Sequence, residues 1–244
     1  MTQHSPTAHK LKYFWLRARQ ALRAGRRPEV RTKDFFGRTL QRVVRVYRPR
    51  RILDIGSWDG RGTTTCLLSK LTYVPEIIDC VELVTSRAEI IRREIVPLFP
   101  FVRVHNVSTL LYDDWSYKDF ERDLWEHLPE DARARIKKQE TLAAWQREEA
   151  ALKGARHAFL PAAAAPHYEL VVLDGGECTG WDEYRLLKGR FDIIAFDDVF
   201  KAFKSYWAYH DMQKEGEFEL VAASRFVRRG FAVFARKGLA TFAP

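Results

Sequence analysis

The chain has 244 residues, of which 46% are hydrophobic and 13% aromatic, a composition that excludes wholesale disorder and fits one globular domain with a full core, or a domain plus a small appendage. Its formal net charge of +9 is uneven, because residues 1–51 hold 15 Lys and Arg against 2 Asp and Glu, a balance of +13 that leaves −4 for the rest. No apolar run approaches the length of a membrane span, the N-terminus lacks the apolar core of a secretory signal, and the three cysteines form neither a metal-like spacing nor a disulfide framework. We therefore expect a cytoplasmic protein with no membrane span.

Two helices are predicted ahead of the first strand, over residues 8–25 and 33–48, because their apolar residues recur at helical spacing. Pro49 stops the second helix, so residues 1–49 form a basic N-terminal helical segment. Such a segment is either a solvated, arginine-rich helical face or an arm that binds nucleic acid, acidic lipid or an anionic substrate. No nucleic-acid-binding motif accompanies the charge, so the sequence favours a small-molecule partner over nucleic acid.

From residue 50 the chain alternates between strand-like and helical patterns. Seven strands are predicted, at residues 51–56, 77–83, 101–107, 168–174, 191–198, 218–224 and 229–237. Helices are predicted between them, at residues 62–71, 86–99, 180–189 and 201–213. This alternation is typical of βαβ units in a parallel sheet, and the last two strands are close enough in sequence to pair as an antiparallel hairpin. We therefore predict an α/β fold, a doubly wound seven-stranded sheet, over residues 50–244.

The alternation breaks between about residues 111 and 166, where charged, helix-prone sequence surrounds three tryptophans. This stretch is too long for one crossover helix. We predict that it is a helical insertion in the domain, which shapes the ligand pocket and covers it as a lid.

Acidic residues recur at the ends of four predicted strands, namely Asp54, Glu82, Asp174 and the pair Asp197 and Asp198. In doubly wound sheets, ligands bind beyond the carboxyl ends of the strands, where the strand order reverses. The sequence therefore predicts the functional site at this edge of the sheet.

The first of these strands runs into a glycine turn that spans Gly56 to Gly62. Its G-x-x-x-G-x-G spacing differs from the G-x-G-x-x-G of nicotinamide-binding turns. Glu82 follows about 20 residues later, at the end of the second strand, where a carboxylate accepts two hydrogen bonds from a ribose diol. Together these features fit an adenosine-containing cofactor, and the alternative for Glu82 is a capping or surface acid.

The sequence "LDIGSWDGRGT" around this turn resembles the first motif of the class I S-adenosylmethionine (SAM)-dependent methyltransferases, which have a Rossmann-like fold. Many members have a glycine where this chain has Trp58. A branch of small-molecule O-methyltransferases has the pattern IGS-aromatic-x-GRS/T, with which Arg61 and Thr63 agree. The resemblance covers roughly residues 50–110 and 165–237.

The resemblance implies SAM as the cofactor and assigns the parts of its site. The methionine side is lined by Asp54, Gly56 and Ser57, the ribose is bound by Glu82, and the adenine lies beside Asn106 and Ser108. The full set of implied cofactor-binding residues is Asp54, Gly56, Ser57, Trp58, Gly60, Thr63, Glu82, Leu83, Asn106, Ser108 and Asp174.

Three aspartates end two strands that we expect to be neighbours, Asp174 on one and Asp197 and Asp198 on the next. Three carboxylates at one edge repel one another unless a positive charge lies between them, and Mg²⁺ with its oxygen ligands fits that need. This region resembles the metal-dependent O-methyltransferases, including catechol O-methyltransferase and the sugar O-methyltransferases of antibiotic pathways. The resemblance implies that all three aspartates bind the metal, which in turn binds two vicinal substrate oxygens and lowers the pKa of one of them.

The general base departs from the pattern of these relatives, which have a Lys or His three residues after the first aspartate. This chain has Glu177 there, which could take the proton or act as an extra metal ligand. The other candidates for the base are His210 and a metal-bound hydroxide. Phe203, Tyr206, Trp207 and His210 also have the spacing of a core-facing helical stripe, which is the packing alternative for His210. The catalytic candidates are Glu177, Asp174 and His210.

The function predicted from the sequence is SAM-dependent O-methylation of a small molecule, a sugar diol or a phenol, assisted by Mg²⁺. Two alternatives remain open, a nucleic-acid methyltransferase that uses the basic N-terminal arm and a SAM-binding module without turnover. A homo-oligomer is compatible with the sequence.

Overall fold

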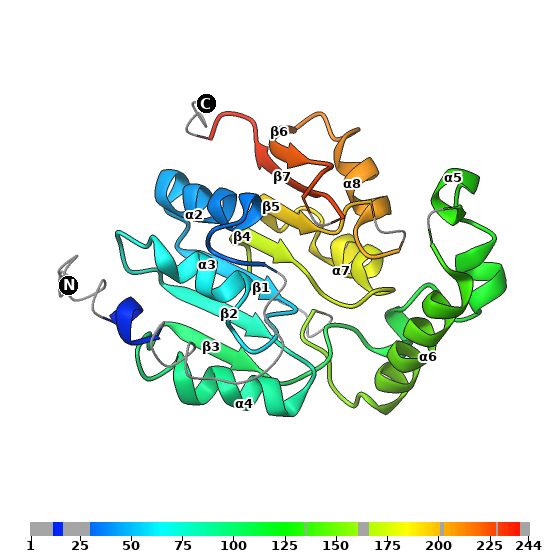
Figure 1. Ribbon diagram of the computed structural model, residues 1–244, viewed down its shortest axis with the longest axis horizontal. Helices are drawn as coiled ribbons and strands as arrows, with labels where there is room; N and C mark the ends of the chain where they lie inside the picture. The colour runs from blue at the N-terminus through cyan, green and yellow to red at the C-terminus, as the bar shows by residue number, and fades with distance from the viewer. Residues whose placement is uncertain are drawn as a thin grey trace. The chain divides into compact units, whose positions relative to one another are not determined.

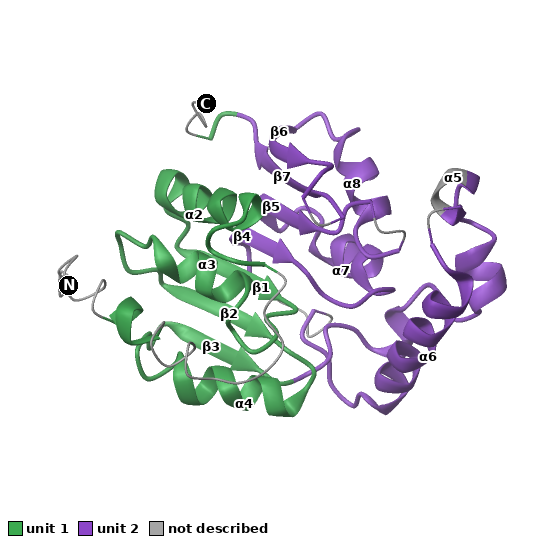
Figure 2. Cartoon of the chain, in the orientation of Figure 1, with its two compact units in different colours: residues 1–106, 238–244 green, residues 107–237 purple. Residues whose placement is uncertain are grey.

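The computed structural model describes residues 12–16, 30–134, 136–160, 166–200, 203–227 and 229–239. The chain divides into two compact units, Met1–Asn106 with Gly238–Pro244 and Val107–Lys237 (Figures 1 and 2). Of the predicted helix over residues 8–25, residues 12–16 are helical and the remainder lies outside the described residues. The predicted domain boundary after residue 49 stays a prediction.

The first unit is built from strands that alternate with helices. Its elements are α2 (Phe35–Tyr47), β1 (Arg51–Ile55), α3 (Thr63–Ser69), β2 (Ile77–Val81), α4 (Thr85–Glu94) and β3 (Val102–His105). β1 pairs with β2 and β2 with β3, both in parallel. Every residue of β2 is buried, as expected for a strand covered on both faces and as its apolar run predicts.

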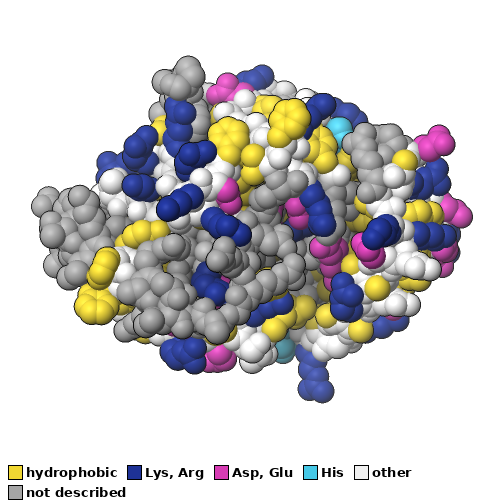
Figure 3. All heavy atoms as spheres, viewed as in Figure 1, with side chains coloured by type: hydrophobic (Ala, Val, Ile, Leu, Met, Phe, Trp, Pro, Cys, Tyr) yellow, Lys and Arg dark blue, Asp and Glu magenta, His cyan; other side chains and the backbone are white. Residues whose placement is uncertain are grey.

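Helix α2 is amphipathic, with clear start and stop signals. The carboxylate of Asp34 accepts the N–H of Gly37 at 2.6 Å and caps the first turn. Arg48 ends the helix in the left-handed conformation, with φ of 51°. The buried face consists of Phe36, Gly37, Thr39, Leu40, Val43 and Val44. Arg38 and Arg45 on the opposite face are exposed, and Lys and Arg side chains are spread over the face of the molecule drawn in Figure 3; the two alternatives for the basic segment stay predictions.

The second unit carries the remaining strands. Its main elements are β4 (Tyr168–Leu173), α7 (Gly180–Leu187), β5 (Phe191–Asp197), α8 (Tyr206–Met212), β6 (Phe218–Ser224) and β7 (Phe231–Arg236). β4 and β5 are parallel, whereas β7 runs antiparallel to both β5 and β6. The sheet order is β3-β2-β1-β4-β5-β7-β6. The predicted seven-stranded, doubly wound sheet with a C-terminal antiparallel hairpin is therefore confirmed.

The helix predicted over residues 201–213 is wrong at its start, because α8 begins only at Tyr206. Phe203 has φ of 83°, which no right-handed helix accommodates, and it lies in a turn with its side chain buried. The predicted stripe of Phe203, Tyr206, Trp207 and His210 is therefore also wrong. The side chains that α8 buries are those of Ala208, Tyr209 and Met212.

The predicted insertion is helical in its described part. It contains the short helices η1 (Tyr112–Asp114), η2 (Phe120–Trp125) and α5 (Glu130–Arg133), followed by the longer α6 (Lys138–Gly154). The rings of Trp115 and Trp145 stack with centroids 5.7 Å apart, and Phe120 packs edge-on to Trp145 at 6.0 Å. The tryptophans thus supply the apolar core of a segment whose sequence is otherwise highly charged.

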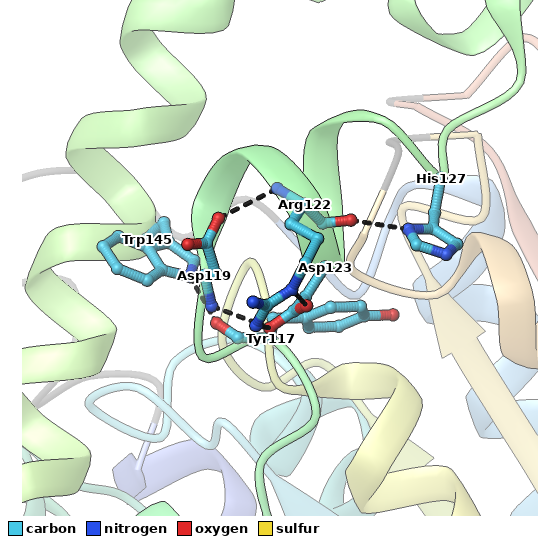
Figure 4. A network of polar contacts seen from close by, with 6 residues as sticks. All are labelled: Tyr117, Asp119, Arg122, Asp123, His127 and Trp145. Carbon is cyan, nitrogen blue, oxygen red and sulfur yellow. Dashed lines mark hydrogen bonds and ion pairs between the residues drawn. The ribbon is translucent and has the colours of Figure 1, made fainter.

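A local polar network holds the single π-helical turn of η2 (Figure 4). Asp119 accepts the N–H of Arg122 at 2.9 Å, and Asp123 accepts the N–H of Asp119 at 2.8 Å. The Trp145 ring donates to the carbonyl of Tyr117 at 2.6 Å and ties this turn to α6. Of all the helices in the described ranges, none combines the length and apolarity needed to cross a bilayer.

Candidate functional site

The turn after β1 has an unusual backbone. Gly56, Trp58 and Gly60 all have positive φ, at 75°, 52° and 77°. This conformation suits glycine but costs a tryptophan about 1–2 kcal/mol. A Cβ on Gly60 would lie 2.4 Å from the side chain of Ile95, so the turn also needs glycine there for close packing.

The carboxylate of Glu82 lies against this turn. It is 5% exposed, and one of its oxygens accepts the N–H of Val84 at 2.8 Å. Burial raises the pKa of Glu82, while the N–H of Val84, the charge of Arg87 and the nearby backbone of Trp58 act against that rise. Glu82 is therefore held at the turn, where the sequence predicts a ribose-binding carboxylate.

The indole of Trp58 has its own partner. The guanidinium of Arg87, from α4, lies 3.4 Å from the centre of the Trp58 ring and 3.7 Å from the Glu82 carboxylate. A cation over an indole contributes about 0.5–2 kcal/mol, enough to offset much of the backbone strain at Trp58. The turn, β2 and α4 are thereby connected around Glu82.

Asp54 anchors the start of α3. It is fully buried, and its two carboxylate oxygens accept the hydroxyls of Thr63 at 2.8 Å and Thr64 at 2.6 Å. The hydroxyl of Ser57 donates to the carbonyl of Asp54 at 2.6 Å. A negative charge at the first turn of a helix is favourable. The structure thus gives Asp54, Ser57 and Thr63 a role in shaping the turn, and their predicted contacts with the cofactor stay predictions.

The two residues predicted beside the adenine fall in different units. The amide of Asn106 donates to the carbonyls of Glu82 and Leu83, both at 2.9 Å, and so links the ends of β2 and β3. Ser108 belongs to the second unit, where its carbonyl accepts the N–H of Phe159 at 2.9 Å. The adenine assignment of both residues stays a prediction.

In the second unit, a buried lysine lies between the predicted metal ligands. The ammonium nitrogen of Lys204 is 2.5 Å from the Asp174 carboxylate and 3.4 Å from that of Asp198. The lysine side chain is only 9% exposed. Burial alone lowers the pKa of Lys204, but the charges of the neighbouring aspartates outweigh it and raise the pKa above its ordinary value.

The arrangement of these side chains does not fit Mg²⁺. The ammonium group of Lys204 lies where a cation shared by Asp174 and Asp198 would have to bind. Within the described ranges, no group of three or more His, Cys, Asp and Glu side chains is suited to a metal ion. The structure therefore does not support the predicted metal site, and the positive charge among these carboxylates comes from the chain itself.

The loop after β4 is held by a half-buried carboxylate from α6. Glu148 accepts the N–H of Glu177 at 2.5 Å and that of Cys178 at 2.8 Å. Burial raises the pKa of Glu148 to about 7, while both hydrogen bonds act against the rise. A Cβ on Gly176 would lie 2.8 Å from Glu148, so the glycine makes room for this contact. Nothing in the polar sequence of α6 marks Glu148 for this role.

A second carboxylate, that of Glu183 on α7, is buried under the same loop. It is 1% exposed and accepts the hydroxyls of Thr109 and Thr179. Its second oxygen is buried without a hydrogen-bond partner among the described residues. Burial raises the pKa of Glu183 to about 7. The sequence reasoning missed this residue, because a Glu in the first turn of a helix is ordinarily a surface residue.

A cavity of about 660 Å³ in the second unit lies between α6 and the loops that follow the strands. Glu177 lines it together with Phe200 and Phe203. Its basic lining residues are Lys137, Arg147, Arg225 and Arg229. Lys137 pairs with Glu140 at 2.8 Å, which leaves the three arginines in excess over Glu177. The cavity therefore suits a ligand with a negative charge and an apolar part.

His210 is half-buried on α8. Its ring lies 4.4 Å from that of Tyr206, and its Nδ1 is 3.2 Å from the side-chain oxygen of Gln213. The described lining of the cavity does not include His210. Its catalytic role, like that of Glu177 and Asp174, stays a prediction.

The fold is that of known methyltransferases. No protein-family model matches this sequence, and no curated protein matches it. An O-methyltransferase from Bacillus cereus, solved with S-adenosylhomocysteine, is 15% identical with a TM-score of 0.52, over 96% of this chain and 92% of that one. The O-methyltransferase TomG from Streptomyces achromogenes, involved in tomaymycin synthesis and solved with SAM, is 12% identical with a TM-score of 0.51, over 98% and 93%. The chain therefore has the Rossmann-like fold of the class I methyltransferases, as its glycine turn predicts.

Proposed function

We propose that the chain is a SAM-dependent O-methyltransferase acting on a small molecule, with the glycine turn of the first unit binding the cofactor and the cavity of the second binding the acceptor. The observation that carries the proposal is the buried Glu82 carboxylate at the end of β2, with Arg87 3.7 Å from it and stacked on the Trp58 ring of the glycine turn. The hydrogen bond from the N–H of Val84 leaves further lone pairs on this carboxylate for ribose hydroxyls.

In the proposed reaction, SAM supplies a methyl group activated by its sulfonium. Glu82 binds the ribose, while the arginines of the cavity orient the acceptor. Glu177, which lines that cavity, takes the proton from the acceptor hydroxyl as the oxygen forms its bond to the methyl carbon. The bond between sulfur and the methyl carbon breaks, and the sulfur keeps the electron pair.

The cavity narrows the class of acceptor. A sugar diol or phenol that also carries a carboxylate or phosphate would use the excess positive charge of Arg147, Arg225 and Arg229. The α6 residues in the cavity lining support the predicted role of the insertion in shaping the acceptor pocket. Mg²⁺ has no role in this proposal, because Lys204 provides the charge between the carboxylates. A cytoplasmic location is part of the proposal.

Titration calorimetry with SAM tests the cofactor assignment. Glu82→Ala should weaken SAM binding about 10-fold to 100-fold, because hydrogen bonds to a charged group contribute about 1.5–3 kcal/mol. Glu89→Ala, which removes an exposed carboxylate from the same unit, is the matched control and should bind SAM normally. Thermal unfolding of both variants separates a loss of binding from a loss of folding. Equal SAM affinity in the wild type and the Glu82→Ala variant would refute the ribose assignment.

Methyl transfer from labelled SAM then tests the reaction. The acceptors to test are catechols and vicinal diols, each with and without a carboxylate or phosphate. The charged compounds should be methylated at a higher rate than their uncharged counterparts. SAM binding without transfer to any acceptor would favour the alternative of a binding module. Preferential labelling of RNA or DNA would favour the nucleic-acid alternative.

A further inference from the structure

We propose that Lys204 replaces a divalent metal ion in this protein: its ammonium group binds Asp174 and Asp198 together and makes their acidic centre independent of metal. The proposal concerns the acidic centre of the second unit alone. Its first test requires neither SAM nor an acceptor, so it can fail or succeed separately from the proposed function.

The first argument is the burial of the charge. A lysine side chain that is 9% exposed persists as an ammonium ion only when opposite charges surround it. The carboxylates of Asp174 and Asp198 supply them, at 16% and 4% exposure. The charge of Asp197 also acts on the ammonium. The lysine and the aspartates therefore depend on one another in the folded chain.

The second argument is that the local backbone positions Lys204 beside the carboxylates of Asp174 and Asp198. A Cβ on Gly180 would lie 1.7 Å from the carbonyl oxygen of Lys204, so α7 can begin here only with a glycine. Phe203, one residue earlier, has φ of 83° and a buried side chain. Asp198 also has a left-handed backbone, with φ of 54°. Three local departures from ordinary backbone or packing thus bring the ammonium and the carboxylate together.

The third argument is coordination chemistry. Mg²⁺ requires oxygen ligands at about 2.0–2.1 Å in a near-octahedral arrangement. An ammonium group instead donates up to three hydrogen bonds, and both contacts of Lys204, at 2.5 Å and 3.4 Å, are longer than a bond from magnesium to oxygen. The two cations therefore exclude one another at these carboxylates.

Binding of Mn²⁺, a spectroscopic substitute for Mg²⁺, tests the proposal through the electron paramagnetic resonance signal of the free ion. The wild type should leave the Mn²⁺ signal unchanged. Lys204→Ala should gain a Mn²⁺ site at least tenfold tighter than any in the wild type, because its aspartates lose their counter-ion. Mn²⁺ should also raise the melting temperature of this variant and leave that of the wild type unchanged.

Lys188→Ala is the matched control. Lys188 also binds two carboxylates, those of Asp211 at 2.8 Å and Glu215 at 2.5 Å, but its side chain is 45% exposed. Water can solvate these carboxylates once the lysine is removed, so no tight Mn²⁺ site should form.

Mn²⁺ binding by the wild-type protein tests the proposal even if the Lys204→Ala variant does not fold. A wild-type protein that binds one Mn²⁺ tightly, and loses it in the Asp174→Asn variant, would overturn the proposal. So would a folded Lys204→Ala variant that gains no affinity for Mn²⁺. Where methyl transfer is measured, chelators should leave the wild-type rate unchanged.

Discussion

Two sites of buried carboxylates, one in each unit, are stabilised by different means. In the first unit, both oxygens of Asp54 accept threonine hydroxyls at the start of α3. In the second unit, Asp174 and Asp198 share the full positive charge of Lys204. Removing one hydroxyl donor costs the carboxylate a single hydrogen bond. Removing a buried counter-ion leaves the carboxylates with an uncompensated buried charge, which costs more free energy. The site around Lys204 should therefore be more sensitive to loss of its single cation than the Asp54 site is to loss of one hydroxyl.

The largest expected effect is in the second unit. Lys204→Met should lower the free energy of unfolding by about 3–5 kcal/mol, because it leaves buried carboxylates without their cation. Chemical denaturation monitored by circular dichroism measures the loss. Adding Asp198→Asn to this variant should recover part of the stability. If Lys204→Met lost less than about 1 kcal/mol, the ion pair would not hold this centre together.

The second effect depends on pH and concerns Glu183. Its folded-state pKa of about 7 lies above the ordinary value of 4.5, so its contribution to stability is fully present below pH 4.5 and is lost as the pH rises through 7. Between these limits the loss is at most about 1.4 kcal/mol per pH unit. Glu183→Gln should flatten this dependence, as urea unfolding at pH 5 and pH 8 would reveal. The same slope in the variant and the wild type would contradict the assignment.

The smallest effect is expected in the first unit. Thr64→Val removes one hydroxyl from Asp54 and should lower the free energy of unfolding by about 1–3 kcal/mol, since a buried oxygen loses its donor. Thr141→Val on α6, a half-buried position whose hydroxyl makes a solvent-exposed hydrogen bond, is the control and should lose less than about 0.5 kcal/mol. A loss for Thr64→Val as large as that for Lys204→Met would contradict the contrast between the Asp54 site and the Lys204 site.

The sequence predicts the local structure of the glycine turn after β1 better than that of the acidic centre around Lys204, and the reason is physical. The glycine turn depends on local backbone conformation, and Gly56 and Gly60 reveal it directly because positive φ favours glycine. Trp58 adopts the same conformation, with φ of 52°, although its residue type gives no sign of it. The alternation of strands and helices also depends on local sequence, namely the spacing of apolar residues, and could therefore be predicted as well.

The second region depends on contacts between distant parts of the sequence. The sequence predicts a helix that includes Lys204, since nothing in it indicates the positive φ of Phe203. The need for a cation among the aspartates was predicted, but the sequence pointed to a metal because the lysine is 30 positions from Asp174. Glu148 likewise lies 29 positions from Glu177, on a helix with no distinguishing pattern.

The hydrogen bonds from the loop after β4 to Glu148 limit which segments of this protein can be exchanged. Excision of residues 111–166, or their exchange for the corresponding segment of another protein, would strip Glu177 and Cys178 of the acceptor for their peptide N–H groups. An engineered chimera would have to carry a replacement carboxylate on the new segment. The helical segment and the loop must therefore be exchanged together. Substitutions at Arg225 and Arg229, which line the cavity, change its charge without breaking these hydrogen bonds.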